Sequence, residues 1–140
     1  MNKILIRGAR IFDATGADPF NGDVLIEGDR IKRVSHASGQ IAADGCEVIN
    51  ANGLFLMPGM TEGHAHLSFD NVTATADLIT PPPEEHTLLT ARVAERLLDQ
   101  GFTSAWGASE AKLRLGVAVR NEINAGRLKV FDFLKSHFEK

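Results

Sequence analysis

The first half of the chain alternates short apolar runs with polar turns, which is typical of a small β unit. Isoleucines and leucine close to the amino terminus predict a strand from Lys3 to Phe12 that is interrupted near Gly8. Asp23 to Val34 is predicted to form a hairpin, because two apolar runs flank Gly28-Asp29. A Gly-Asp pair suits a tight turn in which the backbone takes a positive φ.

A second turn signal follows at Asn52-Gly53, which lies between the apolar runs 47–50 and 54–57. Asn-Gly between two apolar runs is a strong hairpin signal, so a second hairpin is predicted here. Residues 35–45 are small and polar and are expected to form a surface loop. Four or five short strands joined by tight turns predict a small antiparallel β unit over residues 1–57.

The second half changes to helical spacing. Residues 67–80 are rich in Thr, Asp and Asn and are expected to be a loop that ends at the prolines 81–83. A helix is predicted after them, with Gly101 as its carboxyl-terminal cap. Its apolar stripe recurs at intervals of four residues, at Leu89, Val93 and Leu97.

A strand and a second helix are predicted to follow. Residues 102–106 are a short apolar run in which Trp106 is expected to pack rather than to act in catalysis. Ser109 is expected to cap the second helix, and Gly126 lies just past its end. The order strand, helix, strand, helix predicts an α/β fold with parallel strands.

Composition and charge argue against several classes of function. The formal net charge is −3 and the isoelectric point is near 5.9, which gives no electrostatic basis for binding nucleic acid. No apolar run is long enough for a signal peptide or a membrane span. Cys46 is the single cysteine and is expected to be a small apolar filler, so a reducing, cytoplasmic location is expected.

The histidines carry the candidate chemistry. If residues 57–66 are extended, the side chains of Glu62, His64 and His66 share one face of the strand. Two imidazoles that converge in this way are good ligands for a divalent metal such as zinc. The alternative is a pair of solvent-exposed histidines at a strand end. His86 is expected to be exposed in the first turn of the first helix and is not a candidate ligand.

Residues 54–67, LFLMPGMTEGHAHL, resemble the first barrel strand of the metal-dependent amidohydrolase superfamily. The resemblance extends from Ile4 to about Gly126. It implies that His64 and His66 bind a catalytic divalent metal, with zinc expected, inside a (β/α)8 barrel. Glu62 stands where that family more often has aspartate.

The resemblance also implies the domain organisation. Residues 1–57 are expected to form a β-sandwich-like unit, unless they are an independent β domain. Residues 58–127 are expected to be the first two βα units of a TIM-like (β/α)8 barrel, since a complete barrel needs about 250 residues. Residues 128–140 depart from the family; they are either a short amphipathic helix or a non-native extension.

The function implied is hydrolysis of a small amide or cyclic amide at a carbon–nitrogen bond by metal-activated water, with this chain as an amino-terminal portion. The later ligands and the general base of the family are not found in it. Two alternatives stay open: a non-catalytic fragment or interaction module, and a metal-dependent barrel hydrolase that acts on phosphate esters. Unpaired strand edges predict self-association of the fragment.

Overall fold

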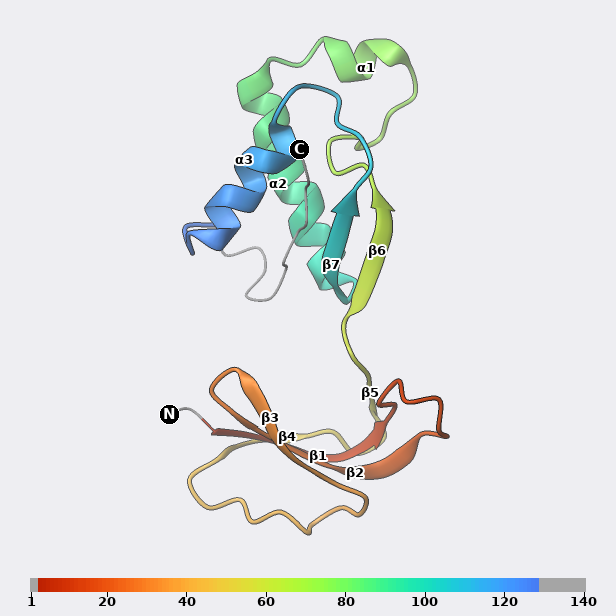
Figure 1. The fold of residues 1–140 in the computed structure, drawn as a ribbon, viewed down its shortest axis with the longest axis vertical. Helices are drawn as coiled ribbons and strands as arrows, with labels where there is room; N and C mark the ends of the chain where they lie inside the picture. Colours follow the sequence, from red (N-terminus) through yellow and green to blue (C-terminus); the bar gives the residue numbers. More distant parts are fainter. Residues whose placement is uncertain (1–2, 129–140) are drawn as a thin grey trace. The chain divides into compact units, whose positions relative to one another are not determined.

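The computed structural model describes residues 3–128 of the chain. The chain divides into two compact units, Met1–Pro58 and Gly59–Lys140, and each is described by itself (Figure 1). Within residues 3–128, no helix combines the length and the apolar character needed to cross a membrane. The tail predicted from residue 128 onward lies almost wholly outside the described residues.

The first unit is a five-stranded sheet built around one central strand. Its strands are β1 (Lys3–Ile11), β2 (Phe20–Glu27), β3 (Arg30–Ser35), β4 (Glu47–Asn50) and β5 (Phe55–Leu56). β2 pairs with β1 and with β3, antiparallel in both cases. The predicted hairpin is therefore confirmed, and Gly28 at its turn has the expected positive φ of 62°.

The interruption predicted near Gly8 is also confirmed. The register between β1 and β2 shifts between Ile6 and Ala9, and Gly8 has a φ of 75°. Asp23 is fully buried, and its carboxylate accepts hydrogen bonds from the backbone N–H of Gly8 at 2.9 Å and of Gly39 at 2.7 Å. This carboxylate therefore stabilises both the bulge in β1 and the loop after β3.

The second predicted hairpin, around Asn52-Gly53, is wrong. β4 and β5 do not pair with each other; both run parallel to β1. The backbone N–H of Ala51 donates to the carbonyl of Arg7 at 2.8 Å, and the backbone N–H of Arg10 donates to the carbonyl of Leu54 at 2.9 Å. The turn thus bulges out opposite the bulge in β1 and returns the chain to the same neighbour. As a result the sheet is mixed rather than antiparallel.

The described part of the second unit, residues 59–128, consists of two parallel strands and three helices. The elements are β6 (Met60–Ala65), α1 (Thr75–Ile79), α2 (Pro83–Asp99), β7 (Phe102–Gly107) and α3 (Leu115–Asn124). β6 and β7 are parallel neighbours, as the order of elements predicts. Figure 1 shows α2 and α3 together beside this pair of strands. The core between strands and helices contains Ala65, Leu67, Ala94, Ala105 and Val119.

The helix boundaries agree with the sequence in part. α2 ends before Gly101, whose φ is 90°, as expected of a carboxyl-terminal cap. α3 begins six residues after Ser109, so the prediction that Ser109 caps it is wrong; the N-cap is Arg114, in the left-handed conformation. The short helix α1 lies within a segment expected to be a loop. Trp106, expected to pack, is 49% exposed.

Candidate metal-binding site

The candidate site lies where the two parallel strands end. β6 ends at Ala65, so His64 is the penultimate residue of the strand and His66 follows it directly. The backbone N–H of Ala108 donates to the carbonyl of Ala65 at 2.8 Å and extends the pairing of β6 and β7 by one bond. The loops that follow the two strands therefore leave the same end of the sheet side by side.

The two imidazoles lie on the same side of the chain. Their ring centroids are 5.0 Å apart, with the planes at 74° to each other. Both rings line a cavity of about 180 Å³ together with Glu62, and Val93 and Leu97 of α2 form its apolar wall. The structure thus brings together the three residues that the alternation along the strand placed on one face.

Glu62 has a local partner in this arrangement. Its carboxylate accepts a hydrogen bond from the backbone N–H of His64 at 3.0 Å. The register between β6 and β7 shifts between Glu62 and Ala65, so the strand is irregular at this point. The carboxylate stabilises the irregular backbone that carries His64.

The ring of His66 is held on two sides. It stacks on Phe69, with ring centroids 4.7 Å apart. Its Nδ1 lies 3.2 Å from the carbonyl oxygen of Ser109 and 3.3 Å from the Ser109 hydroxyl. If Nδ1 carries the hydrogen, it donates to the carbonyl, and Nε2 keeps a free lone pair. Histidines that bind metals commonly have such a carbonyl partner on the other nitrogen.

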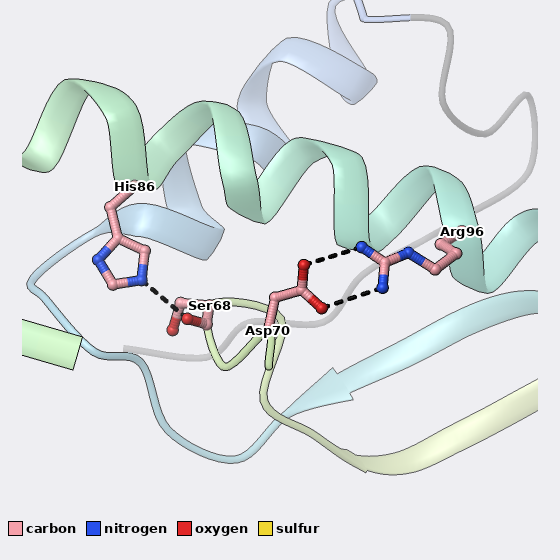
Figure 2. Close-up of polar contacts among 4 residues, drawn as sticks. All are labelled: Ser68, Asp70, His86 and Arg96. Carbon is pink, nitrogen blue, oxygen red and sulfur yellow. Dashed lines mark hydrogen bonds and ion pairs between the residues drawn. The ribbon is translucent and has the colours of Figure 1, made fainter. Parts of the chain in front are cut away.

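Two residues of α2 fasten the loop after β6 (Figure 2). The Nε2 of His86 lies 2.8 Å from the carbonyl oxygen of Ser68, and Arg96 makes two hydrogen bonds to Asp70, at 3.0 and 2.9 Å. The hydrogen bond from Arg96 lowers the pKa of the Asp70 carboxyl. The expectation that His86 is exposed is wrong: only 1% of it is accessible.

Lys112 joins the second loop to the same contacts. Its Nζ lies 2.9 Å from Nδ1 of His86 and donates to the carbonyl of Leu78 at 2.7 Å. An ammonium group can only donate, so Nδ1 of His86 accepts. The ring hydrogen is then on Nε2, which donates a hydrogen bond to the carbonyl oxygen of Ser68. The Ser68 hydroxyl in turn accepts from the backbone N–H of Ala111 at 2.8 Å. Hydrophobic periodicity carries no signal for such a network.

Glu110 is the second residue that the sequence did not single out. Both of its carboxylate oxygens are buried and have no hydrogen-bond partner among the described residues. Burial raises the pKa of this carboxyl, against the opposing effects of the Ser68 hydroxyl and of charge on His66 and His86. A carboxyl three residues after the end of a parallel strand is a signal that could have identified it, because polar groups gather there in barrels.

The two candidate ligands are of a type that binds divalent metals, but they are too few for a complete site. Two neighbouring imidazoles suit zinc and similar ions. Within residues 3–128, however, no group of three or more His, Cys, Asp or Glu residues is arranged to hold a metal ion. The described chain therefore offers part of a ligand set.

Comparisons with known proteins agree with these features. No family model matches the chain. It is 40% identical over 67 residues to a dihydroorotase of Streptomyces coelicolor, which covers 48% of this chain and 14% of that protein. It is 42% identical over 74 residues to a 5'-deoxyadenosine deaminase of Methanothermobacter thermautotrophicus, covering 53% of this chain and 16% of the relative. The chain thus spans about one sixth of the length of these relatives.

Solved structures share the fold. An amidohydrolase structure matches 95% of this chain with a TM-score of 0.76 and 23% identity, over 30% of its own length. The structure of molinate hydrolase matches 91% of the chain, also with a TM-score of 0.76 and 23% identity, over 28% of its length. At these identities the likeness concerns the fold.

Proposed function

We propose that this chain, which belongs to the metal-dependent amidohydrolase superfamily, supplies the first metal-binding strand of a hydrolase that acts on carbon–nitrogen bonds. The observation that carries the proposal is the pair of imidazoles at the end of β6, which line one cavity with their centroids 5.0 Å apart. The dihydroorotase and deaminase names of its relatives favour a small cyclic amide or amidine as substrate.

In this proposal the second unit is the start of a (β/α)8 barrel. The parallel pair β6–β7 and the helices α2 and α3 support it, since a barrel repeats this strand-then-helix order. The first unit would be part of a β-sandwich. A cavity of about 350 Å³, lined largely by apolar side chains of β1, β2 and β3, supports a covering layer on that side of the sheet.

The chain's own residues would prepare the site. His64 and His66 would hold the ion, for which we propose zinc, through nitrogen lone pairs. The Ser109 carbonyl would keep the hydrogen of His66 on Nδ1, and Val93 and Leu97 would exclude water from one wall. When bound, a divalent metal supplies Lewis acidity that makes water nucleophilic near neutral pH. The remaining ligands and the general base would have to come from outside residues 3–128.

A second candidate is a non-catalytic piece that binds metal weakly or associates with other chains. It is favoured by the lack of a third ligand within the described residues. Self-association through the outer edges of β6 and β7 belongs to this candidate, because this sheet has two strands among residues 3–128.

A titration with Co²⁺, a coloured substitute for zinc, tests the proposal on the full 140-residue chain. We expect one weak site whose absorption bands are lost in His64→Ala and in His66→Ala but are kept in His36→Ala, a control histidine of the first unit that stacks on Phe20. Dihydroorotate and adenine added to the metal-loaded chain should not be hydrolysed at a useful rate. Equal binding by all three variants would overturn the metal assignment.

A further inference from the structure

The geometry points to Lys112 and His86 as positioning residues that orient His66 by locking together the two loops at the ends of β6 and β7. The inference rests on the proposed function only for the role of His66 as a ligand. The contacts that carry it are present in the chain itself, without any metal.

Ser68 is the point at which the loops meet. It is 1% exposed, and it uses two different groups: its carbonyl receives the hydrogen bond from His86, and its hydroxyl receives that from the backbone of Ala111. Lys112, the next residue, then closes a ring of contacts by donating to His86. Breaking any one of these bonds leaves a polar group of the ring without its partner.

Lys112 has an unusual set of partners for an ammonium group. No carboxylate of residues 3–128 forms an ion pair with it. Its hydrogen bonds go instead to a carbonyl at the end of α1 and to the imidazole of His86. Hydrogen bonds from an ammonium group to two neutral acceptors depend on where those acceptors lie, so the position of Lys112 is tied to that of α1 and of His86.

The consequence for His66 follows from the backbone. Residues 111 and 112 are fixed to Ser68 and His86, and Ala108 is fixed to the end of β6. Ser109 lies between these anchors, so its carbonyl oxygen is held in place next to Nδ1 of His66. A fixed acceptor favours the tautomer with hydrogen on Nδ1 and a lone pair on Nε2.

The ion pair between Arg96 and Asp70 provides a matched control. It fastens the same loop after β6 to the same helix, and its hydrogen bonds join these two elements without involving the loop after β7. Loss of this ion pair should loosen the attachment of the loop after β6 to α2 without moving the Ser109 carbonyl. The positioning effect is therefore expected for Lys112 and His86 and not for Arg96.

Nitrogen-15 spectra of the imidazoles, recorded on the metal-free full chain, test the inference. In the wild type we expect His66 to carry hydrogen on Nδ1 and His86 on Nε2. Lys112→Met should turn His66 into a mixture of tautomers, and Lys112→Gln, which keeps a donor for His86, should have a smaller effect. Ser109→Ala keeps the carbonyl, so it should leave the tautomer of His66 unchanged, as should Arg96→Met.

Several outcomes would overturn the inference. One is a folded Lys112→Met chain with an unchanged His66; another is a wild-type His66 with hydrogen on Nε2, which would make the Ser109 hydroxyl the donor. If Lys112→Met does not fold, Lys112→Gln decides: a smaller but measurable shift of His66 away from hydrogen on Nδ1 is expected, and no shift would overturn the inference. A Co²⁺ titration of the same variants separates this inference from the proposed function: a loss of about tenfold in affinity is expected for Lys112→Met, whereas no binding by the wild type would remove only the metal role.

Discussion

Two buried carboxylates, one in each unit, have opposite surroundings. Asp23 in the first unit is fully buried, and both of its oxygens receive a backbone hydrogen bond, from Gly8 and from Gly39. Glu110 in the second unit has two buried oxygens and no hydrogen-bond partner among the described residues. The first carboxylate stabilises the fold, whereas the second is left without a hydrogen-bond partner among those residues and interacts electrostatically with one candidate ligand, His66.

The comparison shows that the two units use their buried polar groups differently. In the first unit the buried Asp23 carboxylate accepts hydrogen bonds from backbone N–H groups at the bulge in β1 and in the loop after β3, so its role is structural. In the second unit Ser68, His86 and Glu110 gather at the ends of the strands, where the histidines lie. Buried polar groups without partners are rare in proteins and call for an explanation, often a functional one.

The largest expected effect comes from removing the satisfied carboxylate. Asp23→Ala leaves two buried N–H groups without an acceptor, and each such group costs about 1–3 kcal/mol. We expect the free energy of unfolding of the first unit to fall by about 3 kcal/mol, as measured by urea denaturation. Asp13→Ala is the control, because Asp13 is exposed and its hydrogen bonds within residues 3–128 go to nearby Thr15. Equal losses in both variants would remove the contrast between the two carboxylates.

The next effect belongs to His86, whose two ring nitrogens are both bonded. His86→Ala leaves the Ser68 carbonyl and the Lys112 ammonium each short of a partner, and we expect a loss of about 2 kcal/mol in the second unit. His64→Ala serves as the comparison, because His64 is exposed and should change stability by less than about 0.5 kcal/mol. Hydrogen exchange of β6 and β7 would report both effects. A loss no larger than that of His64→Ala would contradict the network.

A smaller effect, with the opposite sign, is expected at Glu110. Burial raises the pKa of this carboxyl above its ordinary value of 4.5, so the unfolded chain loses the proton first as pH rises. The contribution of Glu110 to the free energy of unfolding should therefore be most favourable below that value and be lost as pH rises through the raised pKa of the folded chain. Glu110→Gln should abolish this part of the pH dependence and stabilise the chain at neutral pH. Parallel pH profiles for the two proteins would show that the carboxyl is satisfied after all.

Local patterns in the sequence predicted much of this, and long-range contacts account for the rest. The interrupted first strand, the hairpin at Gly28 and the helix before Gly101 were recognised because their signals are contained in a few neighbouring residues. The parallel pairing of β4 and β5 was missed, since Asn52-Gly53 has the same local signal in a hairpin and in a bulge. Only the neighbouring strand decides between them.

The candidate site shows the same division. Strand alternation placed Glu62, His64 and His66 on one face, and the structure brings them to one cavity. The partners of His66 and His86 come from residues 43 and 26 positions away, beyond the reach of any periodicity. For that reason Ser109 was mistaken for a helix cap and His86 for an exposed residue.

X-ray absorption at the zinc edge of the zinc-loaded full chain is the most direct test of the central claim, that His64 and His66 bind one ion together. The account predicts two imidazoles around the zinc in the wild type, one in His64→Ala and one in His66→Ala, with solvent oxygen in the remaining positions. The same number of imidazoles in the double variant as in the wild type would contradict the claim and assign the metal to other histidines.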